Sequence, residues 1–187
     1  MDAPQQTLEL RMDAIGAFHA APCSAVLSPC RLYRYDLWRR WSDAPYCMVV
    51  GLNPSTADET QDDPTIRRCV GYAKRWNYGG LCMVNLFAFR ATQPRDMMAA
   101  QDPIGPDNDR TLKTLSQGAG IVIAAWGKDG NHMGRDKQVM ALLPHLYCLK
   151  QNKDGSPAHP LYLRGDATPY PLNGQDQRRC WSKGRKW

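Results

Sequence analysis

The residues whose types and spacing could support chemistry are concentrated in the stretch 51–68. Three aspartates fall close together there: Asp58, Asp62 and Asp63. Carboxylates at this spacing could hold a hard cation such as magnesium. Arg67 and Arg68 follow near the first turn of an expected helix, where the helix dipole already presents positive charge. Two interpretations of these arginines stay open, because they could pair with the aspartates or at least one could bind an anion such as phosphate.

An expected strand and an expected helix flank these residues. The apolar, β-branched run at 47–52 lies between two prolines and is typical of an interior strand. Asp63-Pro64 indicates a helix start, because the aspartate can cap free N–H groups and a proline at the first position gives up no hydrogen bond. Apolar residues then recur at helical spacing up to a stop signal at 77–80. The loop at 51–63 therefore leaves the carboxyl end of a strand, where open α/β sheets bind their ligands.

Further strands and helices alternate along the chain. We expect strands at 81–86, 120–126 and 146–149, and helices that start at Pro64, at Pro106 and near Gly134. Such alternation makes crossover units, so the sequence predicts an α/β fold: a three-layer α/β/α arrangement with a mostly parallel central sheet and an N-terminal antiparallel hairpin strand. Four loops would then leave the same edge of the sheet: 51–63, 85–95, 127–132 and 152–159.

The segment 30–41 interleaves aromatic residues with arginines and is followed by a turn signal at 42–45. We expect it to form an antiparallel hairpin with the 47–52 strand and so to add an outer strand to the sheet. Its arginines and tryptophans could track a nucleic-acid backbone, as in single-strand binders. These residues are Arg34, Trp38, Arg39, Arg40 and Trp41. The alternative is an edge strand with one solvated face.

Length and charge limit the class of protein. The 187 residues are enough for one α/β domain, and we expect a single domain at 1–187 with a core at about 30–165 and a basic tail at 166–187. The net charge of +6 favours polyanionic partners. No apolar segment approaches membrane-spanning length and no signal peptide is recognisable, so we expect a cytoplasmic protein without a membrane partner. The tail is either a solubilising end or an arm that grips nucleic acid.

Seven cysteines are scattered along the chain without a CxxC pair. This distribution indicates reduced thiols rather than a disulfide framework or a zinc site. Cys47, Cys82 and Cys148 lie in expected strands, where a thiol behaves as a small core residue.

Several motifs between about residues 30 and 164 resemble an uncharacterised bacterial and phage family, the domain-of-unknown-function family 1643. They are GLNPSTAD at 51–58, DDPTIRRC at 62–69, VNLFAFRAT at 84–92, AAWG at 124–127 and KDGSPAHPLY at 153–162. This resemblance implies a family but no activity.

Short motifs at strand ends give a more distant resemblance to the uracil-DNA glycosylase superfamily. Gly51-Leu52-Asn53-Pro54-Ser55 is similar to the Gly-x-Asn-Pro-Gly turn of the mismatch-specific branch, with Ser55 in place of the last glycine. The run 84–90 echoes a middle strand of other branches, and Trp126-Gly127 stands where a later strand ends in Leu-Gly. His159-Pro160-Leu161 stands where the superfamily has His-Pro-Ser, so Leu161 replaces a small hydroxyl residue. The cluster-ligating cysteines of the iron–sulfur branches are missing.

The glycosylase resemblance implies hydrolysis of the N-glycosidic bond of a base in DNA or in a nucleotide, without a cofactor or a metal. Asn53 would position the water that attacks the anomeric carbon, and Asp58 or Asp63 would be the base. His159 would stabilise negative charge on the departing base.

The same resemblance implies a set of substrate contacts. Phe87 or Phe89 would stack on a base turned out of its helix, and Asn85 would read the polar edge of that base. The other implied contacts are Gly51, Leu52, Pro54, Ser55, Thr56, Arg67, Arg68, Arg90 and Gly127, of which Ser55, Thr56 and the two neighbouring arginines would hold phosphate. Each residue also has an ordinary alternative as a turn, a helix cap or a core residue.

Three functions therefore remain open from the sequence. The first is an N-glycosidic hydrolase with a role in handling modified bases. The second is a nucleic-acid-binding module that kept the fold without the chemistry. The third is a nucleotide or phosphoryl enzyme with magnesium held by Asp58, Asp62 and Asp63. The sequence predicts no particular oligomeric state.

Overall fold

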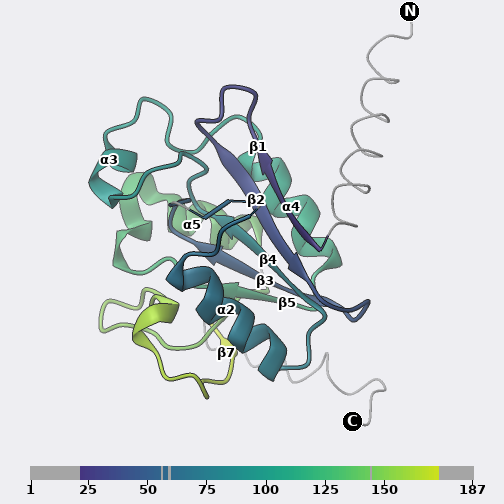
Figure 1. Ribbon diagram of the computed structural model, residues 1–187. Coiled ribbons are helices and arrows are strands. Elements are labelled where there is room, and N and C mark those ends of the chain that lie inside the picture. Colours follow the sequence, from purple (N-terminus) through teal and green to yellow (C-terminus); the bar gives the residue numbers. More distant parts are fainter. Residues whose placement is uncertain (1–21, 56, 59, 144, 173–187) are drawn as a thin grey trace, which may run out of the picture.

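The computed structural model describes residues 22–172, apart from residues 56, 59 and 144. Its strands form one seven-stranded sheet in the order β1-β2-β4-β3-β5-β6-β7 (Figure 1). The strands are β1 (Cys23–Leu27), β2 (Arg34–Arg40), β3 (Tyr46–Gly51), β4 (Gly80–Asn85), β5 (Ile121–Ala124), β6 (Tyr147–Cys148) and β7 (Tyr170–Pro171). The described helices are α2 (Pro64–Arg75), α3 (Pro94–Met98), α4 (Asn108–Gly118) and α5 (Arg135–Leu142), with short 3₁₀ helices η1 (Lys128–Gly134) and η2 (Pro160–Tyr162).

The fold is α/β, because helices pack on a β-sheet. The sheet is mixed, because it combines parallel and antiparallel strands. Parallel pairing is confined to the four middle strands, β4, β3, β5 and β6. β1, β2 and β7 run antiparallel to their neighbours. Helical crossovers join the parallel strands, whereas the short link at 28–33 allows β1 and β2 to form a hairpin. The prediction of a mostly parallel sheet therefore holds for the middle strands only.

The predicted hairpin between the 30–41 segment and β3 is wrong. β2 pairs with β1 on one side and with β4 on the other, while β3 lies between β4 and β5. The crossover through α2 inserts β4 between β2 and β3, so β2 is neither an outer strand nor an edge strand with a solvated face. Leu37 and Trp38 are buried at its centre, and Arg34 and Arg39 are buried as well.

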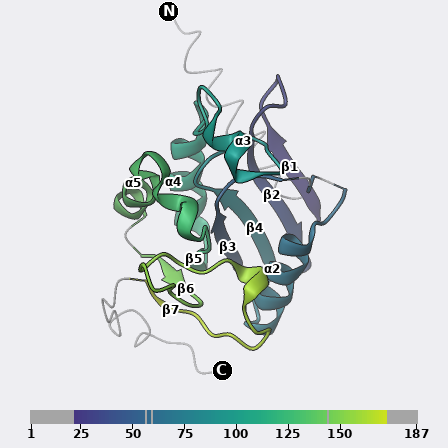
Figure 2. The same ribbon diagram turned by 90° about the vertical axis from the view of Figure 1, so that its left-hand side faces the viewer.

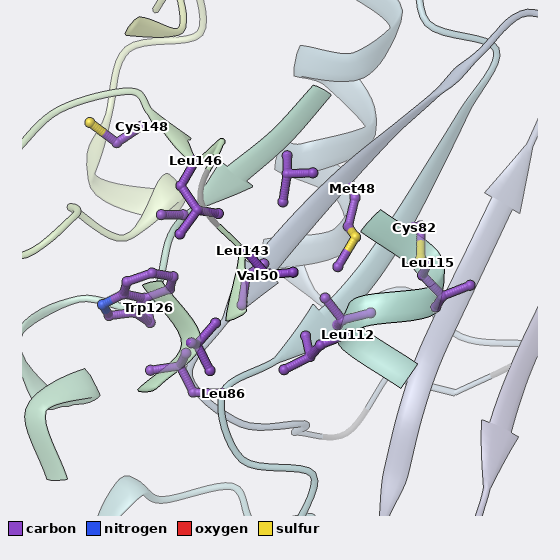
Figure 3. Close-up of a cluster of buried hydrophobic side chains, with 14 of the residues drawn as sticks. Met48, Val50, Cys82, Leu86, Leu112, Leu115, Trp126, Leu143, Leu146 and Cys148 are labelled. Carbon is purple, nitrogen blue, oxygen red and sulfur yellow. The ribbon is translucent and has the colours of Figure 1, made fainter. Parts of the chain in front are cut away.

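Helices pack against both faces of the sheet through two hydrophobic clusters. Successive residues of a strand point to opposite faces, so β3 contributes to both clusters. One cluster joins β3 to α4 and α5 and contains Met48, Val50, Leu112 and Leu115 (Figure 3). Val139 of α5 belongs to the same cluster. The other joins β3 to α2 and contains Cys47, Val49, Ile66, Cys69 and Ala73.

The helix predicted from Pro64 is confirmed as α2, and its cap is the predicted one. Asp63 Oδ1 accepts a hydrogen bond from the Ile66 N–H at 2.8 Å. After the helix, Asn77 adopts a left-handed conformation with φ of 60°, which turns the chain toward β4. Local capping chemistry thus fixes both ends of the element that follows the candidate loop.

The sheet extends beyond the predicted core of 30–165 at both ends, because β1 precedes that range and β7 follows it. Residues 173–187 of the predicted basic tail lie outside the described residues. The cysteines predicted as core residues, Cys47, Cys82 and Cys148, are free thiols and buried. Across the part of the chain that the structure describes, no helix is both long and apolar enough to cross a membrane.

Candidate functional site

A cavity of about 820 Å³ lies at the carboxyl ends of β3, β4 and β5. As predicted, residues from all four loops line it. Examples are Asn53, Thr92, Lys128 and His159, one from each loop. The segment that carries η2 completes the wall and lies beside α2 (Figure 2). A cavity of this size is in the range of about 300–1,000 Å³ that is typical of small-ligand sites.

Asn53 links two of the loops that form the cavity. Its Nδ2 donates to the carbonyl oxygen of Ala91 at 2.7 Å and to that of Pro54 at 3.0 Å. Because both partners are acceptors, the amide must present its nitrogen to them. No described residue donates to Oδ1, so this oxygen is available to a water or a ligand in the cavity.

Asn85 is the most unusual residue of the cavity. Its side chain is 1% exposed, and neither Oδ1 nor Nδ2 has a hydrogen-bond partner within the described residues. Gly51 lies against it, since a Cβ on that glycine would come within 2.8 Å of Asn85 Oδ1. Buried amides are almost always hydrogen-bonded, so an unpaired donor and acceptor at a cavity wall indicate a ligand position.

Two buried side chains hold the backbone at Asn85 in place. Asn108 Nδ2 donates to the carbonyl oxygens of Asn85 at 3.2 Å and Leu86 at 2.8 Å. Arg135 Nε donates to the Leu86 carbonyl oxygen at 2.9 Å, and its guanidinium pairs with Asp109. The Asn85 amide is therefore positioned rigidly although it has no partner of its own.

His159 is half-buried in the cavity wall at the start of η2. Its Nδ1 accepts a hydrogen bond from the Leu161 N–H at 3.4 Å, so the proton of a neutral ring lies on Nε2. Burial lowers the pKa of His159 below its ordinary value, and the nearby charge of Asp63 opposes that shift. The ring is thus a neutral hydrogen-bond donor near pH 7.

The three clustered aspartates have separate roles. Asp63 lines the cavity while it caps α2. Asp62 pairs with Arg39 at 2.8 Å. Asp58 does not line the cavity, and hydrogen bonds from the backbone N–H groups of Thr60 and Gln61 and from the Thr60 hydroxyl lower its pKa to about 2. Such a carboxylate is a weak base, so Asp63 is the better placed of the two candidate bases.

The positions of Asp58, Asp62 and Asp63 do not support a shared magnesium site. Each of the three carboxylates is engaged by a different protein donor, and they do not converge on one point. No group of three or more His, Cys, Asp or Glu side chains that could hold a metal is found among the described residues.

The predicted stacking phenylalanines lie outside the cavity. Phe87 is fully buried in the core and its ring is 5.6 Å from that of His132. Phe89 packs edge-on against Tyr33, with ring centroids 6.0 Å apart. Neither is placed to stack on a base in the cavity, because the chain turns these side chains inward after β4. The aromatic residues that line the cavity are Trp126 and Tyr162.

The remaining predicted contacts divide into four groups. Gly51, Leu52, Ser55 and Gly127 line the cavity, while Pro54 and Arg90 do not. Arg67 and Arg68 line a separate groove of about 430 Å³ along α2, together with Arg75. Thr56 lies outside the described residues. The two arginines predicted to hold phosphate are thus near the cavity but not in it, and Arg67 donates to the Asp62 backbone carbonyl at 2.6 Å.

The family described as "Protein of unknown function (DUF1643)" matches residues 34–161, more than half of the chain. The chain belongs to this family. No match was found among the curated proteins or among the solved structures.

The DUF1643 match contains all residues that line the cavity except Tyr162 and Leu163. The cavity is thus built almost wholly from the family's segment of the chain. It also includes residues that the sequence offers no reason to place at the cavity: Trp126, Lys128, Asp129 and Lys150, and also Arg34, which the sequence suggests only as a nucleic-acid contact on an outer strand. No local signal identifies them, since their place at the cavity depends on strand order and on where each loop returns.

Proposed function

We propose that this protein is a uracil-DNA glycosylase-like hydrolase, which cleaves the N-glycosidic bond of a base in DNA or in a nucleotide and takes part in the handling of modified bases. The observation that carries this proposal is the buried, unpaired Asn85 amide in the same cavity as Asn53 and His159. An amide offers one donor and one acceptor, which is the pattern needed to read the polar edge of an extruded base.

The proposed chemistry uses three side chains of the cavity. Asn53 Oδ1 orients a water toward the anomeric carbon, and Asp63 accepts a proton from that water. The new bond forms between the water oxygen and the anomeric carbon, while the bond from that carbon to the base nitrogen breaks and its electron pair leaves with the base. His159 Nε2–H donates to the base as negative charge develops there, which lowers the energy of the transition state.

The proposal includes a cellular setting and a partner. We propose that the helices on both faces of the sheet form a three-layer α/β/α arrangement of the glycosylase kind. The partner would be DNA or a nucleotide, and no cofactor is required for this chemistry. Free, scattered cysteines are compatible with a reducing compartment, so we propose a cytoplasmic protein.

A non-catalytic nucleic-acid-binding module is the second candidate, and two observations favour it. The Asn53 amide is already engaged with two backbone carbonyls, which is sufficient reason for an asparagine there. Leu161 also provides no hydroxyl next to His159. Both would be expected where the cavity binds a base without cleaving the bond behind it.

Base release separates the two candidates. Purified protein is incubated with uracil-containing DNA and with DNA that carries modified bases, and free base is quantified by chromatography. The hydrolase proposal expects release by the wild type and none by Asn53→Ala, with DNA binding and its salt dependence nearly unchanged in that variant. Asn131→Ala is the matched control, because Asn131 is exposed and does not line the cavity.

Absence of release from every DNA, together with specific binding, would reject the hydrolase in favour of the binding module. Equal release by Asn53→Ala and the wild type would reject the role of Asn53. Absence of both binding and release would reject both candidates.

A further inference from the structure

Arg34 is a buried cation in the cavity wall. It is the first residue of β2 and is 2% exposed. One of its terminal nitrogens, Nη1, donates to the Ala57 carbonyl oxygen, but Nε has no hydrogen-bond partner among the residues that the structure describes. No described carboxylate forms an ion pair with it. An ionised group away from water is costly unless a partner compensates its charge.

The other buried arginines show the usual arrangement. Arg39, on the same strand, pairs with Asp62 at 2.8 Å. Arg135 pairs with Asp109. Arg34 differs from both, and it is also the one of the three that lines the cavity. The difference indicates that its partner comes from the cavity.

The surroundings of Arg34 contain charges of both signs. Burial lowers the pKa of Arg34 to about 10, so its guanidinium stays charged at neutral pH. Arg90 and Arg39 are close enough to oppose that charge, while Asp63 and Asp36 support it. The amino end of α2 reaches the same cavity through Thr65 and Ile66, and Asp63, which caps the helix, is the acidic residue at this end. The positive end of a helix dipole favours anions.

A register shift in the sheet lies next to Arg34. Val26 pairs with Asp36 and Leu27 pairs with Arg34, so Tyr35 is an extra residue on β2. Such bulges re-aim side chains next to functional sites. Arg34 and Arg39 both donate to the 51–63 loop, through the carbonyl oxygens of Ala57 and Asp58.

We infer that Arg34 binds a phosphate group of the nucleotide whose base contacts Asn85. The identity of the base rests on the proposed function, whereas the anion site rests on the unpaired guanidinium alone. The cavity therefore takes a nucleotide with its phosphate rather than a neutral base or nucleoside. The phosphate could belong to a free nucleotide or to a nucleic-acid backbone, since both present the same oxygens to a guanidinium.

Binding measurements test this inference without any need for base release. Deoxyuridine, deoxyuridine monophosphate and a short uracil-containing single strand are titrated into wild-type protein and into Arg34→Gln. We expect the monophosphate or the strand to bind the wild type at least about tenfold more tightly than the nucleoside. Arg34→Gln should lose that preference and bind the nucleoside as before. The ligand whose affinity falls identifies the source of the phosphate.

Two controls assign the effect to the right group. Arg110→Gln removes the same charge from an exposed position on α4, outside the cavity, and should retain the preference for phosphate. Asn85→Ala should weaken nucleoside and nucleotide alike, which would report the base contact separately. If Asn85→Ala binds nucleoside and nucleotide as the wild type does and the phosphate preference stays intact, the proposed function is rejected but the anion site is not.

A competition experiment with the wild type covers the case in which Arg34→Gln does not fold. Inorganic phosphate should displace the phosphate-bearing ligand and leave nucleoside binding unchanged. The inference is overturned if phosphate competes with neither ligand or with both equally. It is also overturned if folded Arg34→Gln keeps the preference of the wild type.

Discussion

Replacing Asn85 with leucine should stabilise the folded protein while it removes ligand binding. The two side chains have the same number of non-hydrogen atoms and branch at the same carbon, and the substitution eliminates two polar groups that are buried without partners among the described residues. An unpaired buried group costs about 1–3 kcal/mol, and the larger leucine side chain offsets part of the benefit of removing two such groups, so we expect a net gain of about 1–3 kcal/mol in the free energy of unfolding. For a chain of this length the gain corresponds to a rise in Tm of about 2–12 °C.

Asn108→Leu is the matched control and should have the opposite sign. Asn108 is equally buried, but its Nδ2 donates to the carbonyl oxygens of Asn85 and Leu86. Its loss leaves those carbonyls without that donor and should lower the free energy of unfolding by about 1–3 kcal/mol. Stability would be measured by urea denaturation, and binding by titration with a uracil-containing oligonucleotide.

The outcome for Asn85→Leu can refute the reasoning directly. If this variant is destabilised as much as Asn108→Leu, the Asn85 amide forms hydrogen bonds with protein groups in solution and is not a free ligand contact. A stabilised variant that still binds the oligonucleotide as the wild type does would mean that Asn85 does not read the base.

Three further predictions concern groups around the cavity. Burial raises the pKa of Asp36 from 3.8 to about 7, although a backbone hydrogen bond from Val26 and the charge of Arg34 act in the opposite direction. Between these two pH values the folded protein holds one proton more than the unfolded chain. The free energy of unfolding therefore falls as the pH rises through about 7. Asp36→Asn should therefore be more stable than the wild type at pH 8, by up to roughly 4 kcal/mol, and a pH-independent difference in urea denaturation would contradict this. Burial lowers the pKa of His159 below its ordinary value of 6.5. If the neutral ring donates to the base, the rate of base release should stay constant as the pH falls to 6.5 and should decline only below that pH. A rate that rises on acidification would show that the charged ring is the donor. Asn53→Ala should lower Tm by about 2–4 °C, because the link to the Ala91 carbonyl is lost, and an unchanged melting curve would show that this link contributes nothing.

The sequence by itself determined the local elements around the site. The Asp63-Pro64 start of α2 depends on a cap three residues from its donor, and the stop at Asn77 depends on one left-handed residue. The apolar runs of β3 and β5 are equally local signals. Since strands followed by helices place their loops at one edge of a sheet, the shared cavity could also be predicted.

Only the tertiary structure decided which residues face that cavity. The position of β2 between β1 and β4 buried Arg34, which the pattern of 30–41 alone would leave at a solvated edge. Phe87 and Phe89 follow the predicted strand end but turn into the protein, while Arg67 and Arg68 lie on the outer groove of α2. Strands and loops that are distant in the sequence decide whether a side chain is exposed and which groups it contacts. A local pattern of residue types does not indicate which distant segment will pack against it.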